Sequence, residues 1–196
     1  MGQPRILAFA GSTREASFNK RLVRAAAGFA SAAGAAVTAI DLRDFPLPLF
    51  DEDIEARDGL PEPGRRLKEL FRQNDGLLIS TAEYNSSLPA VLKNAIDWLS
   101  RPEAGQAPLS CFNGKVAAIM AASPGALGGL RCLYHLRAVL QNINVMVLPE
   151  MRAVSSAQNA FDDQGAIRDE GVRTAVERIA RQLVDTVRRL AQGARS

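Results

Sequence analysis

The sequence predicts an α/β protein in which helices cover both faces of a doubly wound parallel sheet. Three observations support this fold class. Short apolar runs alternate with amphipathic helical segments along the chain, as in repeated strand–helix units. The runs are apolar throughout, which is typical of strands that are buried on both faces. Because crossovers between parallel strands are right-handed, only a few topologies satisfy this order of elements.

The expected strands are the short apolar runs bounded by turn residues. They comprise residues 5–10, 36–42, 76–82, 115–122 and 144–150. Helices are expected where apolar residues recur every three or four positions. These segments are 19–33, 63–74, 88–101, 129–141 and a final stripe of Val172, Val176, Ile179, Leu183, Val187 and Leu190. We therefore expect a three-layer α/β/α arrangement.

Length and organisation predict a single domain over residues 1–196. A chain of 196 residues suits one full-sized core. The sequence shows neither an internal repeat nor a linker. Residues 43–62 form a long loop rich in proline and acidic residues, for which we expect a lid or a contact surface.

The composition disfavours several functional classes. The chain is 47% hydrophobic and 23% charged, unlike a disordered protein. Its net charge is +3 and its basic residues are scattered, so we expect no nucleic-acid partner. No apolar stretch reaches membrane-spanning length and the first residues do not resemble a secretion signal, so we expect no membrane association. Cys111 and Cys132 lack the spacing of a metal or redox motif, and buried, reduced thiols fit a cytoplasmic location.

Residues 11–19, GSTREASFN, lie where the first strand must turn into the first helix. A helix N-terminus carries unpaired N–H groups and partial positive charge, which favour an anion. Hydroxyls, an amide and a guanidinium would complete a phosphate site. The candidate ligands are Ser12, Thr13, Arg14, Ser17 and Asn19. A capped helix with a surface arginine explains the same residues, so the loop alone leaves both interpretations open.

Two further loops, 81–88 and 123–130, also follow predicted strands. Ligands of doubly wound sheets bind at the carboxyl ends of the strands, so one ligand could contact all three loops. Two other phosphate-binding motifs are absent. A P-loop ending at Gly114-Lys115 would need glycine at position 109, where the chain has leucine, and the dinucleotide-binding motif GxGxxG does not follow the first strand. The phosphate is therefore expected to belong to a mononucleotide.

Longer motifs resemble the NAD(P)H-dependent FMN reductase family, the flavodoxin-like group that includes quinone, azo-dye and chromate reductases. GSTREASFN resembles the family's GSxRxxSxN phosphate loop. TAEYNSSLPAVLKNAIDWLSR (81–101) resembles its long TPEYNxSxPGxLKNAIDWxSR motif. SPGALGGLRCLYHLR (123–137) and DLRDFPLPLFDED (41–53) match further family motifs. The resemblance runs from about the first strand to the last.

This resemblance implies a flavodoxin-like fold with strand order 2-1-3-4-5 and FMN at the switch point of the sheet. It assigns two sets of FMN contacts. In the second set, Glu83, Tyr84 and Asn85 act largely through backbone groups, and Ser123 and Gly125 close the other side of the ring. The phosphate set is Ser12, Arg14, Ser17 and Asn19. The ring set is Glu83, Tyr84, Asn85, Ser123 and Gly125.

The chain departs from the family pattern beside the expected flavin ring. Ala82 stands where the family usually has proline, and Ser86 stands where an aromatic residue or histidine is frequent. A small residue at position 86 would open the substrate side of the ring, so the preferred acceptor stays open. Ala90 in place of glycine is a mild change within a helix.

The activity implied by the resemblance is hydride transfer from NAD(P)H to flavin N5, and then reduction of a quinone, azo dye, metal oxyanion or free flavin. Backbone N–H groups near the ring would stabilise the reduced flavin, so we expect neither a catalytic side chain nor a metal. The choice between NADPH and NADH stays open. The family is usually dimeric or tetrameric, so a homodimer or homotetramer with a small-molecule acceptor is expected.

Other functions fit parts of the sequence. A hydrolase could use Ser123 as nucleophile, but Ala121 replaces the first glycine of the elbow and no aspartate lies between Ser123 and His135, the only histidine. A flavodoxin-type electron carrier without reductase activity would share the fold. Such carriers usually expose an acidic docking surface, whereas this chain is mildly basic. A flavin-binding sensor or an inactive relative also stays open.

Overall fold

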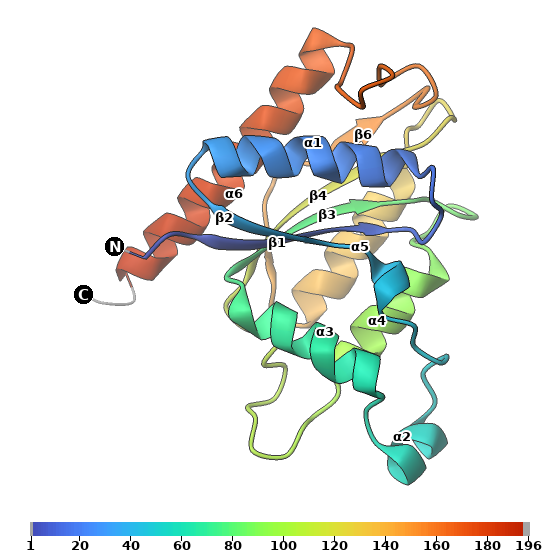
Figure 1. Ribbon diagram of the computed structural model, residues 1–196, viewed down its shortest axis with the longest axis vertical. Coiled ribbons are helices and arrows are strands. Elements are labelled where there is room, and N and C mark those ends of the chain that lie inside the picture. Colours follow the sequence, from blue (N-terminus) through green and yellow to red (C-terminus); the bar gives the residue numbers. More distant parts are fainter. Residues whose placement is uncertain (1, 194–196) are drawn as a thin grey trace.

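The computed structural model describes residues 2–193, and its secondary structure follows the predicted alternation closely (Figure 1). The strands are β1 (Arg5–Gly11), β2 (Ala36–Ile40), β3 (Gly76–Thr81), β4 (Val116–Ala122), β5 (Met146–Val147) and β6 (Arg152–Val154). The helices are α1 (Phe18–Ala32), the 3-10 turn η1 (Leu42–Asp44), α2 (Glu52–Asp58), α3 (Glu62–Gln73), α4 (Ala90–Ser100), α5 (Leu130–Asn142) and α6 (Glu170–Gly193). Within this range no helix is long and apolar enough to cross a membrane.

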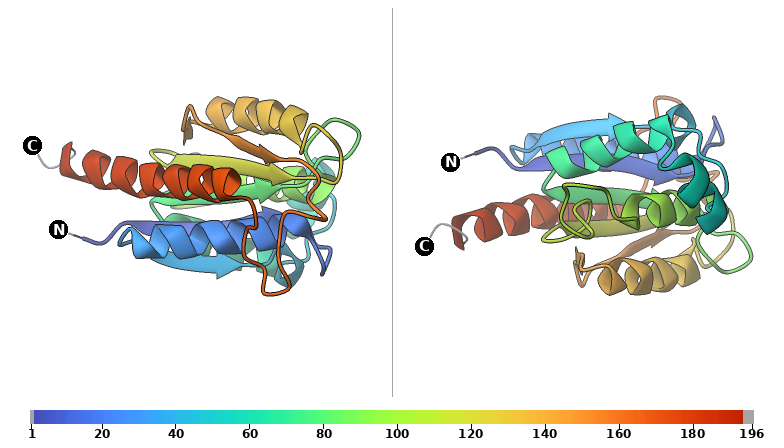
Figure 2. Two further views of the ribbon diagram at one scale, coloured as in Figure 1. Left: turned by 90° about the horizontal axis from the view of Figure 1, so that it is seen from above. Right: turned by 90° about the horizontal axis from the view of Figure 1, so that it is seen from below.

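The strands form one parallel sheet in the order β2-β1-β3-β4-β5, which confirms the predicted topology. Helices α1 and α6 cover one face, and α3, α4 and α5 cover the other (Figure 2). Both faces of the central strands are therefore apolar: every residue of β3 and β4 is buried. The predicted stripe of α6 packs into the first of these cores through Val176, Ile179 and Leu183. Burying each such side chain stabilises the fold by about 1.5–3 kcal/mol.

The prediction of one continuous strand over 144–150 was wrong. Only Met146–Val147 pair with the beginning of β4; the N–H of Leu148 still donates to the carbonyl of Ala117, and the chain leaves the sheet at Pro149. Proline has no N–H to donate to a neighbouring strand, which explains the break. The chain returns as β6, which pairs with Met120–Ala122 at the end of β4.

The expected loop 43–62 contains a helix that the sequence analysis did not predict. Asp51 caps α2, and its carboxylate accepts hydrogen bonds from the N–H groups of Asp53 (2.7 Å) and Ile54 (3.4 Å). The seven residues of α2 lie away from the sheet and none of them is buried. This helix therefore contributes surface rather than core.

The central strands β1, β3 and β4 end at Gly11, Thr81 and Ala122, at the same edge of the sheet. We call this the carboxyl edge, and the opposite one the amino edge. Gly11 is required here, because a Cβ at that position would lie 2.8 Å from Thr81 Oγ1 and 2.9 Å from Leu92 Cδ2. The close packing of β1 on β3 and α4 thus fixes where the loop after β1 begins.

Candidate functional site

A hollow of about 400 Å³ lies at the carboxyl edge, between the loops that follow β1, β3 and β4. That volume is in the range of small-molecule binding sites. The lining residues are Ser12, Arg14, Ser17, Phe18, Asn19, Ala82, Glu83, Tyr84, Ala122, Ser123 and Pro124. The structure therefore brings seven of the ten predicted site residues to one hollow, and leaves Thr13, Asn85 and Gly125 outside its lining.

The N-terminus of α1 opens onto this hollow without an internal cap. Ser17 is the N-cap residue, but its side chain makes no capping hydrogen bond, and the first turn of α1 contains no acidic residue. Ser12 and Ser17 are nevertheless almost fully buried, at 4% and 3% exposure. Free N–H groups and hydroxyls in a sheltered helix N-terminus are the donor set that a phosphate group requires.

Arg14 adds a positive charge to the same corner. Its guanidinium carbon lies 5.3 Å from the centre of the Phe18 ring, in a cation–π contact. Its backbone N–H donates to Ser12 Oγ at 3.3 Å, which fixes the loop. Within residues 2–193 the Arg14 guanidinium has no carboxylate partner, so its donors are available to an anion.

Thr13 is not among the residues that line the hollow, and its carbonyl holds the loop to neighbouring elements. Its carbonyl accepts hydrogen bonds from the guanidinium of Arg43 (Nε at 2.9 Å) and from Lys20 Nζ (3.4 Å). The first loop is therefore fastened to η1 and to α1 from outside. A direct phosphate contact by the Thr13 side chain stays a prediction.

Asn19 is buried, and its side-chain amide is already engaged by two strands. Its Nδ2 donates to the carbonyl of Ala122 at 2.9 Å. Its Oδ1 accepts from the N–H of Ala122 at 2.8 Å and from Ser80 Oγ at 2.9 Å. The phosphate contact assigned to Asn19 stays a prediction; the contacts in the structure clamp α1 to the ends of β3 and β4.

Glu83 is among the residues that line the hollow, and its carboxylate binds the start of α5. The carboxylate accepts from Arg131 Nε at 2.9 Å and from the N–H of Cys132 at 3.1 Å. Burial disfavours its charged form, but the hydrogen bonds from Arg131 and Cys132 outweigh burial and hold the pKa of Glu83 below its usual value. Burial, reinforced by the charge of Glu83, raises the pKa of the Cys132 thiol to about 12. Cys132 is therefore an unreactive core thiol.

Residues 84–87 form a tight two-residue turn at the rim of the hollow. Tyr84 and Ser87 exchange two backbone hydrogen bonds of 3.0 Å, and Asn85 and Ser86 have φ values of 50° and 67°. Two positive φ angles match the type I′ turn, which prefers Asn and Gly at these positions. Ser86 therefore occupies a left-handed conformation that costs about 1 kcal/mol. His135 supports this turn, since its Nδ1 lies 3.0 Å from Ser87 Oγ.

The loop after β4 is held by a segment that the sequence analysis missed. The N–H of Ser123 donates to the carbonyl of Val154, and the carbonyl of Ser123 accepts from the N–H of Ala157, both at 3.1 Å. Gly128 has a φ of 60°, and a Cβ there would lie 2.6 Å from the backbone of Val154 and Ser155. Only glycine fits this contact. No pattern in residues 152–157 indicated it, because their partners are distant in the sequence.

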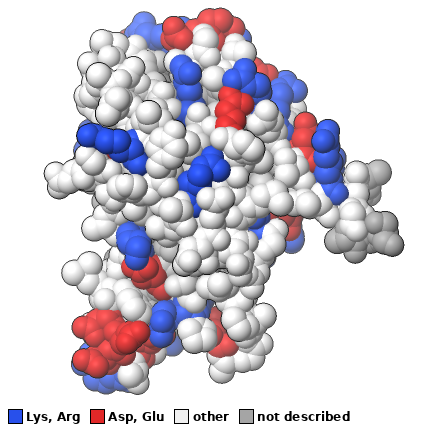
Figure 3. All heavy atoms as spheres, turned by 180° about the vertical axis from the view of Figure 1, so that it is seen from behind, with Lys and Arg blue, Asp and Glu red and all other residues white. Residues whose placement is uncertain are grey.

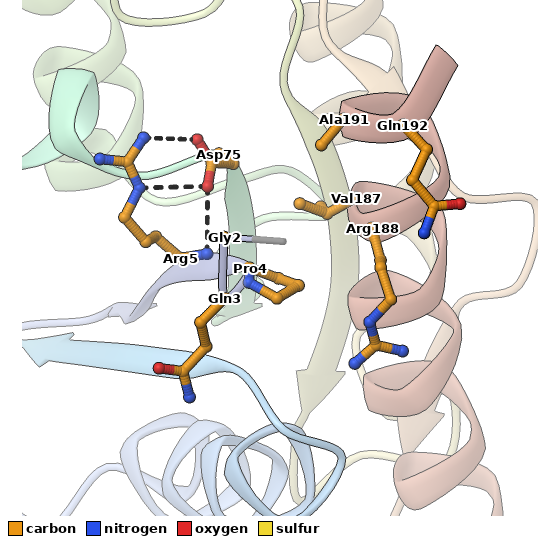
Figure 4. A pocket seen from close by; sticks show the side chains of 9 residues that line it. All are labelled: Gly2, Gln3, Pro4, Arg5, Asp75, Val187, Arg188, Ala191 and Gln192. Atoms are coloured by element: carbon orange, nitrogen blue, oxygen red, sulfur yellow. Dashed lines mark hydrogen bonds and ion pairs between the residues drawn. The ribbon is translucent and has the colours of Figure 1, made fainter. Parts of the chain in front are cut away.

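A second hollow, of about 480 Å³, lies at the amino edge of the sheet (Figure 4). Its charged groups already have partners: Arg5 binds Asp75 through two side-chain hydrogen bonds of 3.2 and 2.7 Å. Arg188 donates to Asp185 at 2.7 Å and to the carbonyl of Ala33 at 3.1 Å. The hollow at the amino edge is larger, but it does not present the open donor set found at the carboxyl edge.

Comparisons with known proteins agree with this geometry. Residues 4–159 match the model of the family described as NADPH-dependent FMN reductase. An NAD(P)H-dependent FMN reductase of Pseudomonas aeruginosa is 41% identical over 189 residues, which are 95% of this chain and 96% of that protein. A quinone reductase of Escherichia coli is 38% identical over 168 residues, covering 85% and 86% of the two chains.

A solved structure supports the same assignment. The flavoenzyme NAD(P)H:(acceptor) oxidoreductase FerB of Paracoccus denitrificans superposes with a TM-score of 0.80 at 28% identity, over 95% of this chain and 98% of that one. The strand order and the donor set at the carboxyl edge fit a flavin mononucleotide. The chain belongs to the NADPH-dependent FMN reductase family.

Proposed function

We propose that this enzyme uses FMN, seated at the carboxyl edge of the sheet, to reduce quinones at the expense of NAD(P)H. The observation that carries the proposal is the uncapped N-terminus of α1. It combines free N–H groups with the buried hydroxyls of Ser12 and Ser17 and the guanidinium of Arg14, inside a hollow formed by three loops. This set suits a phosphate dianion, and the two later loops offer a place for a flat ring.

In this proposal some residues contact FMN, and others hold the loops of the site in place. Ser12, Arg14 and Ser17 bind the phosphate, and Tyr84 and Ser123 lie along the ring. Asn19 and Glu83 act mainly by position, because their side chains fasten α1 and α5 to the loops that form the site. When bound, FMN supplies the chemistry by accepting hydride from the nicotinamide and passing electrons to the acceptor. The chain itself binds FMN, orients it and shelters it from water.

Quinones are the acceptors we favour among those open to a flavin. The lining is mainly neutral, and the small residues Ala82 and Ser86 leave room for a flat ring beside it. Azo dyes, metal oxyanions and free flavin are tested as alternatives. A cytoplasmic location belongs to the same proposal and is supported by the two buried free thiols, Cys111 and Cys132.

The proposal is tested by the colour and the turnover of the purified protein. A preparation reconstituted with FMN should be yellow, and it should oxidise NADPH or NADH rapidly when a benzoquinone is added. Parallel assays with an azo dye, chromate and free FMN rank the acceptors. A yellow protein that oxidises neither nicotinamide unless a partner reductase is present would be an electron carrier, and would contradict the proposal.

A further inference from the structure

A further hollow, of about 200 Å³, lies between α1, β1 and the outer strand β2. It shares no residue with the hollow at the carboxyl edge that we assign to FMN. Its volume is several times the ~30 Å³ that one water occupies in the liquid, so it has room for a small organic group. The proposed reduction of quinones does not use it.

Short side chains create this hollow. Ala8 and Ala10 of β1, Ala39 of β2 and Ala27 of α1 all line it, and Ala8 lies directly opposite Ala39 in the sheet. Elsewhere on the same face of the sheet, larger residues of α1 such as Leu22 are fully buried in the core. Methyl groups do not span the distance between helix and sheet that a larger side chain spans, so an apolar gap remains at this edge.

The hollow is accessible because β2 is the outermost strand. In the described part of the chain the sheet order begins with β2, and no strand lies beyond it. Every residue of β3 and β4 is buried, whereas each residue of β2 is exposed or half-buried. Ala39 itself is exposed. A ligand can therefore enter from the side without displacing any part of the core.

The polar residues of the hollow leave one positive charge unneutralised. Lys20 and Arg24 supply two cations and Asp41 one carboxylate, a net charge of +1. Lys20 Nζ binds the Asp41 carboxylate and also donates to the carbonyl of Thr13 at 3.4 Å. Asp41 accepts in addition from the N–H of Arg43 at 3.0 Å. Lys20 and Asp41 therefore neutralise each other.

Arg24 provides the remaining charge. Its side chain forms no ion pair within residues 2–193, and the residue is exposed although it lines the hollow. Its guanidinium therefore lies at the rim, where a planar set of N–H donors suits a carboxylate. The five acidic side chains of residues 51–58 lie over α2, at the bottom of Figure 1 and the lower left of Figure 3, well away from α1. This acidic group does not neutralise Arg24.

We propose that this hollow binds a small apolar monocarboxylate. The carboxylate pairs with the Arg24 guanidinium at the rim, and the apolar body fills the gap between the four alanines and Val23. One cation above apolar walls matches a single negative charge beside a compact hydrocarbon group. A phosphate dianion fits less well, because Lys20 is already neutralised by Asp41. The proposal does not depend on which acceptor the enzyme reduces.

Titration of the FMN-loaded protein with sodium hexanoate, followed by amide NMR spectra of isotope-labelled protein, tests the site. The amide signals of Val23, Ala27 and Ala39 should shift and saturate. Pentanoate should bind about fourfold more weakly, because it buries one methylene fewer. Hexanol, which lacks the charge, should bind at least about tenfold more weakly. Hexanoate that causes no saturable shift at these residues, or that binds no more tightly than hexanol, would overturn the proposal.

A pair of arginine variants tests the charged end of the site. Arg24→Ala should weaken hexanoate binding at least about tenfold and leave hexanol binding unchanged. Arg21→Ala is the matched control, because Arg21 is exposed on the same helix but does not line the hollow. This control should bind hexanoate as the unaltered chain does. Equal affinities of the two variants would remove Arg24 from the site and overturn the proposal.

A filled hollow tests the apolar end. Ala39→Leu adds a larger side chain at an exposed position that lines the hollow. It should abolish the saturable shifts caused by hexanoate, whereas the thermal midpoint and the bound FMN should be unchanged. An Ala39→Leu protein that retains FMN and binds hexanoate as tightly as the unaltered chain would show that the ligand does not enter the hollow, and would overturn the proposal.

Discussion

The two edges of the sheet differ in what they offer a ligand, although both are hollowed. The hollow at the amino edge measures about 480 Å³ and the one at the carboxyl edge about 400 Å³. At the amino edge Arg5 and Arg188 are neutralised by neighbouring carboxylates. At the carboxyl edge an uncapped helix N-terminus, buried hydroxyls and Arg14 stay open. Open hydrogen-bond donors, rather than volume, therefore distinguish the hollow at the carboxyl edge from the one at the amino edge.

The largest effect is expected from a methyl group placed at the carboxyl edge. Gly128→Ala should lower the free energy of unfolding by about 3 kcal/mol, because its Cβ would overlap backbone atoms and its φ is positive. Gly114 precedes β4 at the amino edge; its φ is 73°, and an added Cβ would have no neighbouring atom within 4 Å. Gly114→Ala should therefore lower the free energy of unfolding by only about 1 kcal/mol. Urea unfolding measures both. Equal losses would show that the Val154–Gly128 contact is not tight.

The next effect concerns affinity for FMN. Arg14→Ala should weaken binding by about 1.5–3 kcal/mol, the value of a hydrogen bond to a charged group. Arg188→Ala removes a cation of the amino edge and should leave the affinity unchanged. Quenching of flavin fluorescence during titration of the apoprotein gives both constants. An Arg14→Ala variant that binds FMN as tightly as the unaltered chain would remove Arg14 from the phosphate site.

The ion pairs of the two edges should respond differently to acid. The pKa of Glu83 is lowered, so its contribution to stability is complete above the usual glutamate value and is lost as pH falls through the lowered one. Glu83→Gln should therefore cost about 1–2 kcal/mol at neutral pH and much less in acid below the lowered pKa of Glu83.

Asp75 of the amino edge provides the comparison. Burial disfavours its charge, but hydrogen bonds from Arg5 lower its pKa as well. Its side chain is 39% exposed, so solvent screens the pair and Asp75→Asn should cost only about 0.5 kcal/mol. Thermal unfolding at several pH values measures both variants. A loss for Glu83→Gln that does not shrink in acid would show that its carboxylate is not the stabilising species.

The smallest effect is expected at a turn. Ser86→Gly should stabilise the protein by about 0.5 kcal/mol, because relief of the left-handed strain exceeds the added freedom of the unfolded chain. Asn144, at the amino edge, has the same φ of 67°. Asparagine tolerates that conformation and its amide donates to Asn113 at 2.9 Å, so Asn144→Gly should not stabilise. A gain at position 144 as large as that at position 86 would contradict this explanation.

The sheet order and helix positions could be predicted because they follow from local patterns. The apolar runs and the apolar stripe of α6 are patterns among residues that are close together in the sequence. The long motifs from 81 to 137 indicated the family. The break at Leu148–Pro149 was visible as a proline, but the return of the chain beside Met120 depends on a pairing that no local pattern encodes. The capped helix α2 was not predicted, because the proline and acidic residues of 43–62 are also typical of an irregular, solvent-exposed loop.

The candidate site was predicted as a set of positions rather than as a set of contacts. Residue types identified Ser12, Arg14 and Ser17, and the structure places all three at one hollow. The same reasoning could not foresee that Asn19 is engaged by Ala122 and Ser80, or that Glu83 reaches Arg131 and Cys132. Those partners lie 48 to 103 positions away in the sequence, so only the folded chain determines them.

The amide of Asn19 has consequences for anyone who redesigns this enzyme. Its three hydrogen bonds, two with Ala122 and one with Ser80, fix the spacing between the start of α1 and the ends of β3 and β4, and no other side chain offers a donor and an acceptor at that length and angle. Combinatorial libraries aimed at new acceptors can therefore vary positions 82, 86 and 124 widely, whereas position 19 should return as asparagine in every active clone.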